Sequence, residues 1–230
     1  NDAGLCSAVA TYTSPTGADN CTGPITIQTA GLASGSAFPI GTTTNVFKVT
    51  DASGNTATCG FAVTVSDTQL PTITCPANIS KVNDSGLCSA VATFTSPTGA
   101  DNCSGPITIQ TAGLTSGSAF PVGVTTNVFR VTDASGNSAT CGFTVTISDT
   151  QLPTITCPAN ISKVNDSGLC SAISTYTAPT GADNCPGQTT IQTAGLASGS
   201  AFPIGTTTNV FRVTDASGNT ATCGFTVTVS

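Results

Sequence analysis

The sequence contains no Glu, His, Trp or Met among its 230 residues, and charged residues make up only 7% of it, against roughly 25% in an ordinary globular protein. Without His or Glu, general acid–base chemistry would rest on Asp or Lys, and each Asp lies in a turn-like motif that recurs along the chain. The composition therefore argues against an enzyme and gives no sign of an organic cofactor.

Long apolar runs and basic patches are also missing. No run of about eighteen apolar residues occurs, so no membrane-spanning segment is predicted. The five basic residues are scattered along the chain, so no patch can neutralise a phosphate backbone and we expect no nucleic-acid partner. Thr, Ser, Ala and Gly fill the polar positions instead, which suits a surface coated by glycans or covered by neighbouring subunits.

What the chain does contain is a nearly letter-for-letter repeat. Cys6, Cys88 and Cys170 mark its period, because they stand at equal spacing in the same sequence context, and the differences between copies are conservative. Such a period is typical of tandem copies of one folded unit. We therefore predict three domains, which cover residues 1–66, 67–148 and 149–230, the first of them without its first strand.

Apolar residues alternate with polar ones within each copy. In Cys141–Ile147, the side chains of Phe143, Val145 and Ile147 fall on one face, with Gly and Thr on the other, as in a half-buried strand. The same alternation occurs in Asn127–Thr132 and Cys88–Phe94, and no segment keeps a helical period. Turn signals separate these runs, so the pattern predicts an antiparallel β-sandwich of about seven strands per copy. A short linker that ends in Pro joins successive copies and favours a semi-rigid rod.

Eleven cysteines recur at periodic positions. Metal binding is the alternative to disulfides, but the chain has neither a CxxC spacing nor a histidine. The pattern therefore indicates disulfides and an oxidising compartment, which means the cell surface or the extracellular space.

Several spaced elements coincide in order with a known family. They are Pro153-Thr154-Ile155-Thr156-Cys157-Pro158-Ala159-Asn160-Ile161, Asp101-Asn102, Phe120-Pro121-Val122-Gly123, and Thr132-Asp133-Ala134-Ser135-Gly136-Asn137-Ser138-Ala139-Thr140-Cys141-Gly142-Phe143. With these elements the whole chain, in all copies, resembles the hyalin-repeat (HYR) family. The resemblance implies an extracellular, immunoglobulin-like domain related to fibronectin type III modules, found in tandem in matrix, adhesion or surface proteins. It implies no enzymatic activity.

The resemblance also implies disulfides. The simplest members of the family have two cysteines, at positions that match Cys75 and Cys141, and these two are expected to pair. By the same match Cys157 pairs with Cys223, and Cys59 pairs with a cysteine outside the sequence. The remaining cysteines are then expected to pair within a copy, although the sequence leaves crossed pairings open. These expected pairs are Cys6–Cys21, Cys88–Cys103 and Cys170–Cys185.

Acidic and amide side chains cluster in two loops of each copy. The simpler interpretation is that Asp133 and Asn137, with their counterparts in the other copies, cap tight turns. The alternative is a calcium site formed by Asp101, Asn102, Asp133 and Asn137 near the linker that holds Asp67. The DxDxDG spacing of a dedicated calcium loop is absent.

Glycosylation is the modification that the sequence supports best. The N-x-[ST] signal occurs at Asn20, Asn78, Asn83, Asn102, Asn160 and Asn165. The alternative is that these residues only form Asn-rich turns. O-linked sugar on the outward Thr and Ser rows is equally compatible with the composition.

The combined prediction is a glycosylated extracellular structural protein that forms a rod or fibre. An adhesin stalk, or an array that binds carbohydrate or protein, is the alternative, and the chain could also be a spacer beside an enzyme. The first copy lacks the counterpart of residues 67–82. We therefore expect the fibre to continue upstream, either as the same polypeptide or through head-to-tail association with a subunit that inserts the missing strand.

Overall fold

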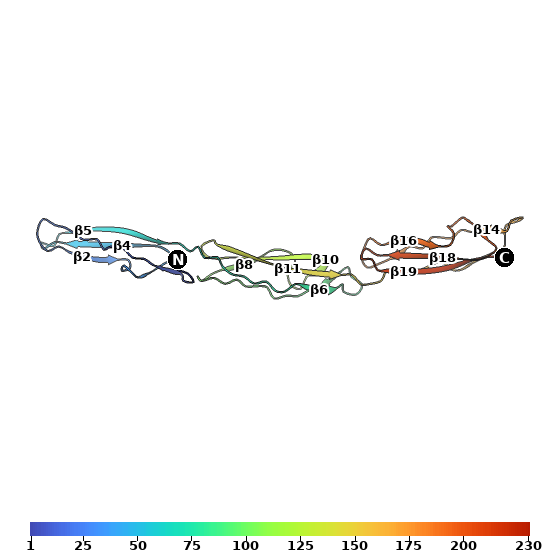
Figure 1. Cartoon of the computed structure of the whole chain (residues 1–230), viewed down its shortest axis with the longest axis horizontal. Helices are drawn as coiled ribbons and strands as arrows, with labels where there is room; N and C mark the ends of the chain where they lie inside the picture. The colour runs from blue at the N-terminus through green and yellow to red at the C-terminus, as the bar shows by residue number, and fades with distance from the viewer. The chain divides into compact units, whose positions relative to one another are not determined.

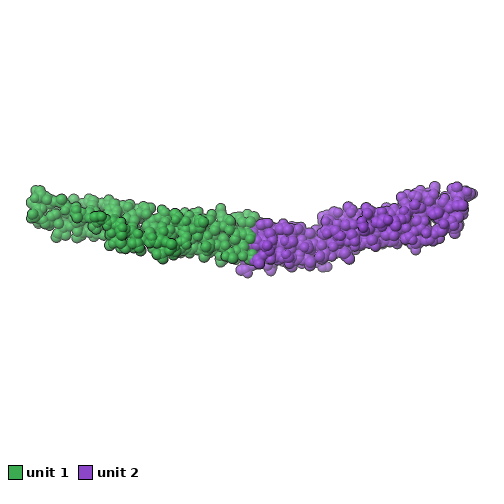
Figure 2. All heavy atoms as spheres, viewed as in Figure 1, with its two compact units in different colours: residues 1–76, 96–112, 128–142 green, residues 77–95, 113–127, 143–230 purple.

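The computed structural model describes residues 1–230, which form strands, turns and loops (Figure 1). No segment forms a helix of the length and apolarity that crossing a membrane requires. The chain divides into two compact units, coloured separately in Figure 2, and the division runs through the middle copy. One unit contains residues 1–76, 96–112 and 128–142, and the other contains residues 77–95, 113–127 and 143–230. The predicted domain boundaries stay a prediction.

The middle copy contains six strands. They are β6 (Ile79–Val82), β7 (Ser89–Val91), β8 (Ile107–Ala112), β9 (Ala119–Pro121), β10 (Gly123–Thr132) and β11 (Ser138–Ser148). One sheet has the order β6-β11-β10-β8, and β7 pairs with β9 in a second sheet. The first strand of the copy, β6, runs parallel to the last, β11, with Ile79 opposite Val145. The copy is thus closed by its own first strand.

The third copy repeats this arrangement with eight strand segments. They are β12 (Thr154–Ile155), β13 (Ile161–Lys163), β14 (Ser171–Ile173), β15 (Gly181–Ala182), β16 (Thr189–Ala194), β17 (Ala201–Pro203), β18 (Gly205–Thr214) and β19 (Thr220–Val229). The larger sheet has the order β13-β19-β18-β16, and β14–β17 and β12–β15 are antiparallel pairs. The segment before β14 therefore contributes two short strands to different sheets.

The first copy contains β1 (Ser7–Val9), β2 (Ile25–Ala30), β3 (Ala37–Pro39), β4 (Gly41–Thr50) and β5 (Thr56–Val65). Its larger sheet has the order β2-β4-β5, and β1 pairs with β3. No strand pairs with the outer edge of β5, where β6 and β13 lie in the other copies. This sheet edge is therefore open in the first copy, whereas in each of the other two copies the copy's own first strand covers it.

The core lies between the two sheets of each copy. In the third copy, Phe202 from the smaller sheet packs with Phe211, Phe225 and Val227 from the larger one. In the middle copy, Phe143, Val145 and Ile147 are buried and Arg130 is exposed, as the alternation predicted. The predicted all-β class with tandem sandwich domains is confirmed.

Candidate functional site

Each copy has two distinct ends, because its two longest strands run from one end to the other. In the first copy, β4 and β5 pair along their full length, from Gly41 opposite Val65 to Thr50 opposite Thr56. The turn that joins these strands marks one end, which we call the leading end. The chain passes to the next copy at the other, trailing end.

The trailing end of the first copy contacts the leading end of the middle copy. The Asn1 side-chain amide donates to Leu5 O (2.9 Å) and to Asp67 Oδ1 (2.8 Å), which ties the first turn to the linker. The Gly4 amide donates to Gln69 Oε1 at 2.9 Å. Asn102 of the middle copy donates from Nδ2 to Leu5 O at 3.0 Å. Side-chain amides therefore bridge the two copies through backbone groups.

The second junction has the same contacts, one repeat further along. Asn184 Nδ2 donates to Leu87 O at 2.9 Å, and the Gly86 amide donates to Gln151 Oε1 at 2.8 Å. Asn219 Nδ2 donates to Asp149 O at 3.2 Å, as Asn137 does to Asp67 O at the first junction. The junction is thus a recurring structural element.

A disulfide closes each junction. Cys6 is bonded to Cys103, with the Cα atoms 5.1 Å apart, and Cys88 is bonded to Cys185, with the Cα atoms 4.9 Å apart. Cys103 and Cys185 are buried, whereas their counterpart Cys21 is exposed. Successive copies are therefore linked by a disulfide bond in addition to the polypeptide linker.

These bonds correct the pairings expected within a copy, namely Cys6–Cys21, Cys88–Cys103 and Cys170–Cys185. Cys6 precedes Ser7, which pairs with Pro39 at the trailing end of the first copy. Cys21 lies in the loop before Ile25, which pairs with Thr50 at the leading end. The two ends are separated by the length of β4, or roughly 30 Å at about 3.3 Å per residue. A disulfide requires Cα atoms within about 7 Å.

The other bridges lie where the family resemblance places them. Cys75 is bonded to Cys141 and Cys157 to Cys223, so each joins the start of a copy to its last strand. Cys59 has no such partner and is a free, exposed thiol, as are Cys21 and Cys170.

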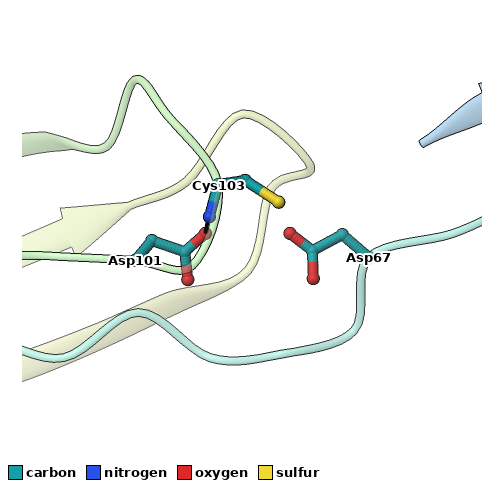
Figure 3. A group of neighbouring side chains, drawn as sticks. All are labelled: Asp67, Asp101 and Cys103. Carbon is teal, nitrogen blue, oxygen red and sulfur yellow. Dashed lines mark hydrogen bonds between the residues drawn. The ribbon is translucent and has the colours of Figure 1, made fainter. Parts of the chain in front are cut away.

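Two aspartates meet at each junction. Asp67 lies in the linker and Asp101 in the loop that carries Cys103; at the second junction Asp149 and Asp183 have the same places. In Figure 3 the carboxylates of Asp67 and Asp101 point toward each other, with the Cys103 sulfur beside them. Ligand atoms of these three residues all lie within 4.8 Å of one another. The sulfur is bonded to Cys6, so the carboxylates are the chemically available groups.

The Asp133–Asn137 turn caps itself, in agreement with the simpler interpretation. Asp133 Oδ1 accepts hydrogen bonds from the amides of Ser135 (2.9 Å) and Asn137 (2.8 Å), and Oδ2 accepts one from Asn137 Nδ2 (2.8 Å). Burial by itself raises the pKa of Asp133, but these hydrogen bonds, Asn137's first among them, outweigh it and hold the pKa below its ordinary value. Both carboxylate oxygens of Asp133 are thus engaged within the turn, and Asn137 Nδ2 donates both within the turn and to Asp67 O at the junction. Asp101 and Asn102 lie at the junction itself.

The glycosylation signals fall into three structural groups of two residues each. Asn78 and Asn160 are exposed, and each uses Oδ1 to accept a backbone hydrogen bond, at 2.9 and 2.8 Å. Asn83 is buried and Asn102 half-buried, and both donate from Nδ2 to a carbonyl at a junction. Asn20 and Asn165 are exposed. Because a glycan is attached to Nδ2, the first group is suited to carry one and Asn83 and Asn102 are not.

The HYR domain family matches this chain three times, at residues 2–65, 66–147 and 148–229. A relative named Hyalin from Strongylocentrotus purpuratus is 40% identical over 225 residues, which are 95% of this chain and 18% of the relative. Hyalin from Lytechinus variegatus is 33% identical over 233 residues, which are 98% of this chain and 43% of the relative. The chain thus spans less than half the length of either relative.

Solved structures with a distant likeness are cadherin repeats. The Drosophila N-cadherin EC1-3 structure aligns with a TM-score of 0.39 at 9% identity, covering 95% of this chain and 92% of that one.

Proposed function

Because the chain belongs to the HYR domain family, we propose that it is a non-enzymatic stretch of an extracellular structural fibre, in which each copy is locked to the next. The observation that carries the proposal is the recurrence of one junction: Cys6–Cys103 and Cys88–Cys185 have the same sequence separation of 97 and lie among equivalent hydrogen bonds. Disulfides of this kind persist in oxidising compartments, which supports an extracellular location.

The free thiols fit the same rule of connection. Cys170 is the counterpart of Cys6 and Cys88, and Cys21 is the counterpart of Cys103 and Cys185. If every junction is alike, Cys170 pairs with a Cys21-type thiol of a following copy, and Cys21 pairs with a Cys170-type thiol of a preceding copy. Copies can be added in this way without any new kind of contact.

The exposed edge of the first copy fits one specific occupant. A hollow beside β5 is lined by Phe47, Val49 and Cys59, among others. Phe61 is only half-buried, whereas its counterpart Phe225 is buried in the copy whose edge is covered by β13. We propose that a segment with the sequence of residues 67–82 covers this edge and forms a disulfide with Cys59, as a preceding copy or a donated strand would.

The proposal is tested by giving the chain that segment. In a variant with a second copy of residues 67–82 placed before Asn1, Cys59 should bond to the added cysteine, so that free thiols fall from the present three to two. On oxidation at high concentration this variant should form a ladder of multimers, with Cys170 and Cys21 joined in the cross-linked peptides. Cys21→Ser should abolish the ladder, and the unextended chain is the control in which Cys59 keeps its free thiol.

The outcomes are distinguishable by non-reducing gel and peptide mapping. A variant in which Cys59 stays free while the added cysteine bonds elsewhere contradicts the strand proposal. A variant that remains monomeric, or forms multimers through cysteines other than Cys21 and Cys170, contradicts the rule that connects the copies.

A further inference from the structure

We propose that each junction binds one calcium ion. The first site consists of Asp67, Asp101 and Asn102, and the second of Asp149, Asp183 and Asn184. The proposal concerns the junctions within this chain and does not depend on fibre formation.

Three oxygens at each site are buried without a hydrogen-bond partner. At the first junction they are Asp67 Oδ2, Asp101 Oδ1 and Asn102 Oδ1, and the second junction has the same three atoms in Asp149, Asp183 and Asn184. Asp67 and Asp149 are each only 7% exposed. Buried oxygens almost always have a partner, and no protein group engages these three oxygens at either junction, so they are available to bind a cation.

Two carboxylates of like charge face each other at each junction, with oxygens within 4.8 Å of each other. The hydrogen bonds that Asp67 and Asp101 accept come from amide groups, those of Asn1, Gln69 and Cys103, and not from Lys or Arg. Two like charges taken out of water are unfavourable unless a cation accompanies them. A divalent ion neutralises the pair.

The geometry suits calcium. An ion about 2.4 Å from each oxygen can bridge two oxygens up to about 4.8 Å apart, and calcium accepts carboxylate, amide and water oxygens in flexible arrangements of about six to eight. The Cys103 sulfur is held in its disulfide, so the remaining donors are oxygens, which favours calcium over zinc. Asp101 and Asn102 also line a hollow of about 210 Å³. Water ligands can complete the coordination from this hollow.

The first copy contains an internal comparison. Its Asp19 and Asn20 correspond to Asp101 and Asn102, and the Asp19 carboxylate accepts the same hydrogen bond, from the Cys21 amide at 3.1 Å. Asp19 and Asn20 are exposed, however, whereas Asp101 and Asn102 are half-buried at the junction. The loop therefore forms alone, and the neighbouring copy turns it into a site.

Equilibrium dialysis against calcium chloride, after removal of metals with a chelator, tests the proposal. The chain should bind two calcium ions, with dissociation constants of about 0.1 to 1 mM, the range of extracellular modules. Asp67→Asn and Asp149→Asn should each leave one strong site, and the double variant none. Asp19→Asn is the matched control, because it changes the same loop where no junction forms, and it should leave both ions bound.

Amide NMR during the titration gives a local readout. Calcium should shift the signals of the linker and of the Asp101–Cys103 loop, and magnesium at equal concentration should shift them far less. Asp101→Asn provides a second variant in case Asp67→Asn does not fold, and disulfide mapping verifies that Cys6–Cys103 still forms. If the folded wild type binds no calcium at about 10 mM, well above the expected dissociation constants, or if the double variant still binds two ions, the proposal is wrong.

Discussion

Removing the disulfide between the first two copies should destabilise the first copy selectively. The perturbation is the double substitution Cys6→Ala with Cys103→Ala, which leaves no unpaired thiol from this bridge. While the middle copy stays folded, the bridge closes a loop of about 60 residues, from Cys6 to the linker at Asp67, and the loop-entropy relation gives a loss of about 4 kcal/mol in the free energy of unfolding of the first copy.

Tyrosine fluorescence can isolate that copy. The chain has two tyrosines, Tyr12 in the first copy and Tyr176 in the third. The middle copy has Phe94 at the equivalent position, packed edge to face on Phe143, so Tyr176→Phe is compatible with the fold. In this background, urea unfolding followed through Tyr12 reports the first copy alone.

The matched control is Cys88→Ala with Cys185→Ala, which opens the other junction and should leave the Tyr12 transition nearly unchanged. If the Cys6–Cys103 variant unfolds at the same urea concentration as its parent, the bridge does not stabilise the first copy. If both double variants shift the Tyr12 transition equally, the bridges do not act locally. Either result refutes the stabilisation worked out above.

Three further predictions concern local structure. Burial raises the pKa of Asp215, but hydrogen bonds from Asn219 and Ser217 outweigh it and lower the pKa. The contribution of this turn to the free energy of unfolding is therefore full above about pH 4, and it is lost as the pH falls through the lowered pKa of Asp215 in the folded state. Thermal unfolding between about pH 2 and 6 should show this loss, and Asp215→Asn should reduce the slope. Gly195→Ala should destabilise the third copy by about 2 to 4 kcal/mol, because a Cβ there would clash with Asn209 Oδ1. The control is Gly199→Ala, which has a similar φ but open space around the added Cβ and should reduce stability less in calorimetry. Equal effects of the two substitutions would show that the contact with Asn209 is unimportant. In a secretory host that attaches N-glycans, glycopeptide mass spectrometry should find sugar at Asn78 and Asn160 and none at Asn83 or Asn102, where the amide is engaged at a junction; occupancy at Asn102 would contradict the junction.

The strands could be predicted because their pattern is local. Alternation in Cys141–Ile147 places Phe143, Val145 and Ile147 on one face, and all three are buried. Asp133 could be assigned to its turn for the same reason, since its hydrogen-bond partners lie within the same short turn.

The disulfides between copies could not be predicted from the sequence. In a tandem repeat, Cys88 has one Cys103-type neighbour within its copy and another in the next, and both recur with the same period. Only the length of the paired strands shows that Cys103, the candidate within the copy, lies at the opposite end of that copy from Cys88. The meeting of Asp67 with Asp101 depends on the same junction. The calcium ligands proposed from the structure therefore include Asp67, and they leave out the turn residues of the set expected from the sequence.

Asn209 is a further residue that the sequence does not single out. It is fully buried, and its Oδ1 accepts hydrogen bonds from the Leu196 amide (2.9 Å) and Gln192 Nε2 (3.1 Å). It fixes the loop after β16 against β18. The alternation that points Phe211 and Val213 inward also places Asn209 on that face, but the sequence does not show which groups the buried amide binds.

Small-angle X-ray scattering tests the central claim, that locked junctions make the copies a rod. At about 3.3 Å per residue, the long strands with their linker advance each copy by about 40 Å, so three copies in line give a length of about 120 Å and a radius of gyration of about 35 Å. A compact chain of this length would have a radius of gyration of about 17 Å. A radius of about 35 Å for the oxidised chain supports the rod, and a radius of about 17 Å contradicts it.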